Sequence, residues 1–188
     1  MLGSAVQRLI RLYGVKPGKR AVVACYSGTG YGVALDLIEV GVEVVAVIDL
    51  SDTPTEDPRH HAVSDYGIKI LKGYGLREAI ADKSSAHIAQ VVVAPVIDEG
   101  QLSDTQQTLD CDLLCVSTGW IPAASLVAHA TGKIVYREEF GTFAVQSIPQ
   151  KMQVVGAANG TWGVDLTIEE GCRAGAAASG QDVKPVMV

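Results

Sequence analysis

The chain has 188 residues, of which 48% are hydrophobic and only 5% aromatic, and its formal net charge is −6. This length suits one domain, or one domain with part of another, and folding would bury about 70% of the unfolded surface without a disulfide or metal. The acidic balance, with no lysine or arginine cluster, argues against nucleic acid or an anionic membrane as partner. No apolar run approaches about 20 residues, so we expect a cytoplasmic protein that does not span a membrane.

The first part of the chain predicts two β–α–β units, because apolar β-branched runs alternate with segments of helical periodicity. The predicted elements are a helix over 4–13, a strand over 21–26, a helix over 30–40, a strand over 42–50, a short helix over 59–66 and a strand over 68–71. The Val, Ile and Ala content of these strands is typical of a parallel sheet with helices on both faces. The fold class is therefore α/β and Rossmann-like.

An antiparallel meander is predicted to follow, over about 68–110, in place of a crossover helix. Its pieces are 74–81, 87–97 and 105–109. The later elements are a strand over 111–116, a helix over 123–130, a strand over 133–136, a buried strand over 152–155, a turn over 156–160 and a long helix over 164–179. In that last helix the pair Glu169-Glu170 is expected to lie on a solvated face.

The glycine-rich turn after the first strand is the main candidate site. Ser27, Gly28, Thr29 and Gly30 stand between a strand and a helix, where backbone N–H groups can bind a pyrophosphate. Asp49 ends the second strand, 21 positions after Gly28, which suits an acceptor for a ribose hydroxyl. This arrangement predicts NAD binding. Two alternatives remain open: a tight turn without a ligand, and a carboxylate that only caps the next turn.

No catalytic or metal-binding set can be assembled from the sequence. The four cysteines (25, 111, 115 and 172) include no C-x-x-C pair. His60 and His61 stand in a polar segment with too few further ligands at suitable spacing for a metal. We therefore predict no catalytic residue and no metal ligand in this chain.

The order of these motifs resembles one arrangement in a known family. The motifs are RLYGVKPG at 11–18, ALDL at 34–37, CDLL at 111–114, STGWIP at 117–122 and VGAANG at 155–160. Together they resemble the second nucleotide-binding domain of the pyridine nucleotide-disulfide oxidoreductases (1–136), followed by the returning strand and helix of the first such domain (137–188). More narrowly, they are similar to the α subunits of heterotetrameric sarcosine oxidases and related amine and opine dehydrogenases.

The resemblance implies a part of an oxidoreductase complex that oxidises a secondary amine such as sarcosine with NAD and flavin (FAD and FMN). It implies a fragment of a longer subunit whose partner is the flavin-bearing β subunit or the first nucleotide-binding domain. The second site it suggests comprises Gly156, Asn159, Gly160 and Thr161, which would face a first-domain cofactor. In this chain the resemblance implies a dinucleotide-binding scaffold, not the catalytic centre.

Two departures from the family pattern concern these sites. The first two fingerprint glycines align with Cys25 and Ser27, whose Cβ atoms would crowd the turn, and only Gly30 matches. The family's Gly-Asp pair appears here as Gly156-Ala157.

Two other classes of function remain possible. One is a non-catalytic scaffold, for which we expect exposed apolar surface around Trp120, Phe140, Phe143 and Trp162. The other is a stand-alone NAD(P)-dependent dehydrogenase of the short-chain type, since residues 27–34 half match its glycine turn. That class needs a tyrosine four residues before a lysine, and no tyrosine of this chain has one.

Overall fold

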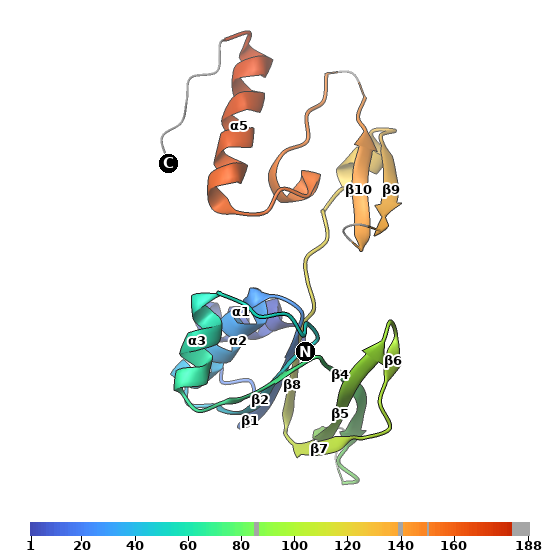
Figure 1. The fold of residues 1–188 in the computed structure, drawn as a ribbon. Coiled ribbons are helices and arrows are strands. Elements are labelled where there is room, and N and C mark those ends of the chain that lie inside the picture. Colours follow the sequence, from blue (N-terminus) through green and yellow to red (C-terminus); the bar gives the residue numbers. More distant parts are fainter. Residues whose placement is uncertain (85–86, 139–140, 150, 182–188) are drawn as a thin grey trace. The chain divides into compact units, whose positions relative to one another are not determined.

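The computed structural model describes residues 1–84, 87–138, 141–149 and 151–181 (Figure 1). The chain forms two compact units, Met1–Gly119 (unit 1) and Trp120–Val188 (unit 2). Each unit is described by itself below. Within the described ranges, no helix combines the length and the apolar character that crossing a membrane requires.

Unit 1 is built on a four-stranded parallel sheet. Its strands are β1 (Arg20–Cys25), β2 (Glu43–Asp49), β3 (Lys69–Lys72) and β8 (Leu113–Ser117), in the order β3-β2-β1-β8. The helices are α1 (Gly3–Tyr13), α2 (Gly28–Glu39) and α3 (Pro58–Asp65). This order matches one half of a doubly wound Rossmann sheet, so the predicted α/β fold with a parallel sheet is confirmed.

The two faces of the sheet are covered differently, and this corrects the prediction of helices on both faces. Alternate residues of β1 point to opposite sides. Val23 and Cys25 belong to a core shared with α1, α2 and α3. Val22 packs instead in a core with Val91 and Val93 of the meander. The meander therefore takes the place that a second helical layer would occupy (Figure 1).

The meander itself is confirmed, with one strand more than predicted. It consists of β4 (Tyr74–Ala81), β5 (Ile88–Asp98), β6 (Gln101–Leu102) and β7 (Gln107–Asp110). β5 pairs antiparallel with β4, β6 and β7. The two-residue strand β6 follows directly from the turn at 98–101 and is too short to leave a periodic signal in the sequence.

Unit 2 differs more from the prediction. It contains α4 (Ser125–His129), an antiparallel hairpin of β9 (Lys133–Arg137) and β10 (Thr142–Ser147), a 3₁₀ turn η2 (Gly156–Asn159) and α5 (Val164–Ser179). The prediction did not include β10. The predicted buried strand over 152–155 is wrong: these residues form no strand, and Val155 is 36% exposed. A buried strand needs a neighbour to pair with, and no strand among the described residues of unit 2 pairs with this segment.

Much of the apolar surface of unit 2 is exposed. The helix α5 has no buried residue, and Val164 is 74% exposed. Trp120, Phe143 and Trp162 are all exposed, as expected for a scaffold whose apolar surface is covered by something else. Phe140, the fourth residue of that expectation, lies outside the described residues.

One glycine determines how closely α2 approaches the sheet. A Cβ placed on Gly30 would lie only 2.1 Å from the Cβ of Cys25 in β1. Gly30 therefore has the role of the third fingerprint glycine, which permits close packing of helix on strand. Gly32, on the same helix, has no atom nearer than 3.8 Å to its Cβ position, and that neighbour is the flexible Arg59 side chain.

We predict that Gly30→Ala lowers the free energy of unfolding by about 1–3 kcal/mol, because the added methyl group forces α2 away from β1. The matched control Gly32→Ala should be neutral or stabilise by up to about 1 kcal/mol, since alanine favours a helix. Urea denaturation of the two variants followed by circular dichroism measures the difference. Equal effects of the two substitutions would contradict the packing role of Gly30.

Candidate functional site

The predicted nucleotide site lies at the carboxyl edge of the parallel sheet. There β1 ends at Cys25, β2 at Asp49 and β8 at Ser117, while α2 begins at Gly28. The connection from β1 leads to β2 on one side, and β8 lies on the other side of β1. Open α/β sheets bind ligands at such a switch point.

A short chain of hydroxyl groups crosses this edge. The Ser27 Oγ and Thr29 Oγ1 atoms are 2.9 Å apart, and Thr29 Oγ1 is 3.2 Å from Ser117 Oγ. Ser27 is the residue before α2, yet its side chain makes no capping hydrogen bond to the helix. The hydroxyl chain thus joins the start of α2 to the end of β8.

The space beside Gly28 is filled by a carboxylate of the protein itself. A Cβ on Gly28 would lie 1.8 Å from Asp57 Oδ2 and 2.6 Å from Arg59 Nη2. Asp57 also caps α3, since its Oδ1 accepts from Arg59 N at 2.9 Å. The Arg59 guanidinium donates to the same carboxylate at 2.6 Å and holds its pKa below the usual range.

Asp49 faces the interior of unit 1 and is 3% exposed. Its Oδ2 accepts from the Tyr31 hydroxyl at 2.5 Å and lies 3.5 Å from Lys72 Nζ. Its Oδ1 accepts from Ser51 N at 3.0 Å. Burial, followed by the hydrogen bond to Asp49, raises the pKa of the Tyr31 phenol. Both carboxylate oxygens therefore have partners within the protein.

These residues do not fit a dinucleotide as they lie here. A pyrophosphate placed over Gly28 would meet the Asp57 carboxylate, and a ribose hydroxyl would compete with Ser51 or Tyr31 for Asp49. The structure brings Ser27, Gly28, Thr29 and Gly30 together at the start of α2, with Asp49 at the end of the neighbouring strand. Their contact with NAD stays a prediction.

The second group of predicted site residues lies in unit 2, at the turn before α5. Gly156 and Gly160 both have left-handed backbone conformations, with φ of 64° and 86°. Glu170 of α5 accepts from Gly156 N at 2.6 Å and from Asn159 Nδ2 at 2.9 Å. The bond from Gly156 is the main cause that lowers the pKa of Glu170, and the bond from Asn159 adds to it. Glu170 thus stabilises the turn. The prediction of a solvated helix face for Glu169-Glu170 did not include this contact.

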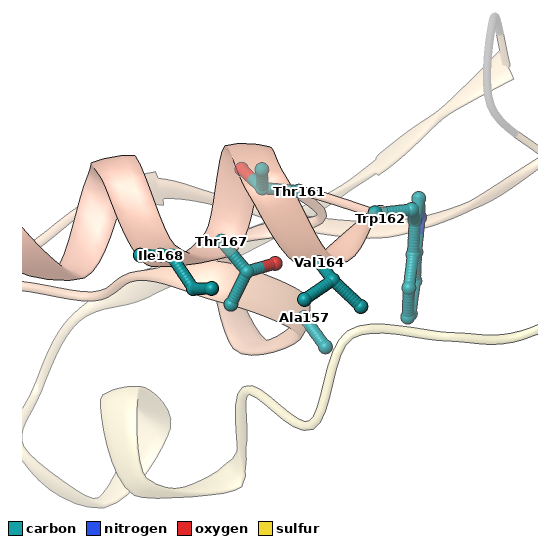
Figure 2. Close-up of a pocket in the computed structure, with 7 residues that line it drawn as sticks. Ala157, Thr161, Trp162, Val164, Thr167 and Ile168 are labelled. Carbon is teal, nitrogen blue, oxygen red and sulfur yellow. The ribbon is translucent and has the colours of Figure 1, made fainter. Parts of the chain in front are cut away.

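Thr161, the fourth member of this group, borders two apolar hollows. The first, about 350 Å³, lies where η2 meets the start of α5 (Figure 2) and is lined by Ala157, Thr161, Trp162, Gly163, Val164, Thr167 and Ile168. The second, about 340 Å³, is lined by Trp120, Pro122, Thr142, Ala144, Asn159, Gly160, Thr161 and Trp162. Trp162, like Thr161, borders both, so an apolar group docked at either would touch this pair.

The part of the chain that the structure describes contains no recognisable metal site and no activated nucleophile. None of its His, Cys, Asp and Glu groups could hold a metal ion. Burial, and then the nearby charge of Asp49, raises the pKa of the Cys25 thiol to about 12, so it remains protonated and a poor nucleophile at neutral pH.

The fold is similar to that of solved pyridine nucleotide-disulfide oxidoreductases. The chain is similar to the thioredoxin reductase of T. acidophilum (TM-score 0.65, 15% identity), covering 86% of this chain and 52% of that one. It is also similar to an FAD-dependent pyridine nucleotide-disulphide oxidoreductase from Desulfovibrio vulgaris (TM-score 0.57, 15% identity), covering 97% and 47%.

Among curated proteins the chain is similar to sarcosine oxidase subunit alpha. The protein from Corynebacterium sp. (strain P-1) is 28% identical over 179 residues, which are 95% of this chain and 18% of that protein. The protein from Rhizobium meliloti (strain 1021) is 28% identical over 171 residues, 91% of this chain and 16% of that protein. The chain therefore spans less than a fifth of these relatives. No protein-family model matches it.

The role of Glu170 in unit 2 gives a prediction that depends on pH. Because its folded-state pKa is lowered, the ordering of the turn by its carboxylate is complete above the ordinary glutamate pKa and is lost as the pH falls through the lowered value. Glu170→Gln should therefore speed hydrogen exchange of the Gly156 amide several-fold at neutral pH. Nuclear magnetic resonance measures this rate.

The neighbouring Glu169 supplies the control, since its carboxylate pairs with Arg173 one turn along α5, whereas the Gly156 amide donates to Glu170. Glu169→Gln should leave the exchange of the Gly156 amide unchanged. The same acceleration in both variants would show that the turn does not depend on Glu170.

Proposed function

We propose that this chain is the scaffold part of an oxidoreductase that oxidises a secondary amine such as sarcosine, within a complex that contains NAD and flavin. The observation that carries this proposal is the similarity to sarcosine oxidase subunit alpha, which extends over 95% of the chain. The similarity includes both units, so it does not rest on the nucleotide-binding fold alone.

A scaffold role agrees with the chemistry of the described residues. The buried Cys25 thiol is protonated, and Asp49 and Tyr31 are bonded to each other. None of these groups lies free to accept a proton or a hydride from a substrate. The catalytic centre would therefore belong to other parts of the complex, and the amine would bind there.

The apolar surface of unit 2 supports a partner. Trp162 is 44% exposed and borders both hollows of unit 2, while Val164 at the start of α5 is 74% exposed. Contiguous exposed apolar surface of this kind is typical of a protein interface. The proposed partner is a flavin-bearing β subunit or a first nucleotide-binding domain, in the cytoplasm.

The turn formed by Gly156, Asn159, Gly160 and Thr161 would form one wall of the cofactor site in that complex. The carboxylate of Glu170 holds this turn from the side of α5. Bound FAD would supply the hydride acceptor and FMN an electron carrier toward oxygen, with NAD held in the same complex, while this chain would contribute backbone N–H groups and an apolar surface.

A purely non-catalytic scaffold is the second candidate, and the position of Asp57 against Gly28 favours it. A stand-alone dehydrogenase of the short-chain type is less favoured. Such an enzyme needs a tyrosine with a lowered pKa, whereas burial raises the pKa of Tyr31.

The proposal predicts that the purified chain alone does not oxidise sarcosine or reduce NAD. The same chain, tagged and recovered from its source organism, should carry flavin absorbance and release hydrogen peroxide when sarcosine is added. Oxygen consumption, peroxide release and NADH absorbance measure these outcomes. Turnover by the chain without any partner would contradict the scaffold role.

We further predict that Trp162→Ala lowers recovery of the flavoprotein about tenfold or more, because aromatic anchors in apolar hollows dominate many interfaces. Leu126→Ala is the control, since Leu126 is 76% exposed in the same unit and lines neither hollow. Equal recovery with both variants would place the interface elsewhere. Flavin absorbance per mole of recovered chain is the readout.

A further inference from the structure

We propose that Asp57 is a built-in anion that takes the place of a dinucleotide phosphate, so that the glycine turn of unit 1 is closed from within. This goes beyond the proposed function, which does not say whether the glycine turn itself still binds a dinucleotide. The inference rests on three features of unit 1: the space beside Gly28, the charge that fills it and the bonding of Asp49.

The first feature is the space. Gly28 is the first residue of α2, so the position beside it is where a phosphate would approach the free N–H groups of the helix. The Asp57 carboxylate lies so close that a Cβ on Gly28 would come within 1.8 Å of Oδ2. Because Gly28 has no side chain, there is room beside it for the Asp57 carboxylate. In a dinucleotide-binding fingerprint the same room admits the pyrophosphate.

The second feature is the charge. Partial positive charge at a helix N-terminus favours an anion, and Asp57 provides one. Arg59 fixes this carboxylate with three donors: its backbone N and Nε at 2.9 Å to Oδ1 and its Nη2 at 2.6 Å to Oδ2. A phosphate would meet a negative group here, and the nearby guanidinium that could attract it is already paired.

The third feature is independent of the first two. Asp49, the predicted ribose acceptor, is 3% exposed and is bonded to Tyr31 and Ser51. The space beside Gly28 that a phosphate would need is thus filled by Asp57, and the acceptor at the end of β2 is bonded to groups of the protein. Unit 1 keeps the fold of a nucleotide-binding domain while its ligand positions are occupied by its own side chains.

The test uses the full chain, inorganic pyrophosphate and ADP. In Asp57→Ser the serine can still cap α3, because serine is among the best N-cap residues, but its short side chain leaves the space beside Gly28 and frees Arg59. We expect the wild-type chain to show no binding in calorimetry, and Asp57→Ser to bind pyrophosphate and ADP at least about tenfold more tightly. The amide signals of Gly28, Thr29 and Gly30 should shift on binding.

A second substitution tests whether the gain arises at this position. Adding Gly28→Ala to Asp57→Ser fills the space again and should abolish the gained affinity. In the wild-type background Gly28→Ala should lower the unfolding midpoint, because its Cβ displaces Asp57, whereas in the Asp57→Ser background it should not. This stability comparison needs no ligand and verifies the contact independently.

Equal affinity of the wild-type chain and Asp57→Ser, whether measurable or absent, would overturn the inference. So would tighter binding that persists in the double variant. The assay contains neither an amine nor a partner protein, so its outcome does not depend on the proposed oxidase complex. Failure of that complex to appear would, conversely, leave the closure of unit 1 intact.

Discussion

The close approach of α2 to β1 is the constraint on which the rest of unit 1 depends. It requires a glycine at position 30, because any Cβ there would overlap the Cys25 side chain. With the helix this close, Tyr31 becomes 1% exposed and its hydroxyl reaches Asp49 at the end of β2. The same approach sets Gly28 at the edge of the sheet, where Asp57 lies against it. One steric condition thus accounts for the contact of Tyr31 with Asp49 and for the place of Gly28 beside Asp57.

The polar groups at this edge are turned toward each other. Burying a carboxylate is costly unless it is hydrogen-bonded, and Asp49 meets that condition with Tyr31 and Ser51, with Lys72 nearby. Asp57 meets it with Arg59. The charged groups at this edge of the sheet are paired within the protein and stabilise its structure. This agrees with a scaffold role for unit 1. Chemistry in the proposed complex would then take place elsewhere.

Unit 2, in contrast to unit 1, leaves much of its apolar surface exposed. Its polar turn is fixed locally by Glu170, while the apolar residues of α5 and both tryptophans remain exposed. Since burial of apolar surface drives association, such a surface is stabilised by a covering partner. The two units therefore differ in what they offer: unit 1 has a satisfied core on both faces of its sheet, and unit 2 has a surface suited to assembly.

The sequence by itself determined the order and type of most elements, because apolar β-branched runs and glycine stops are local signals. It predicted the parallel sheet, the meander and the helix over 164–179, and the family resemblance aligned Gly30 with the third fingerprint glycine. Only the tertiary structure decided that the meander covers the second face of the sheet, that residues 152–155 form no strand, and that Asp57 and Glu170 reach Gly28 and Gly156. These outcomes depend on which segments meet when the chain folds back on itself. Local periodicity carries no information about such contacts between residues distant in the sequence.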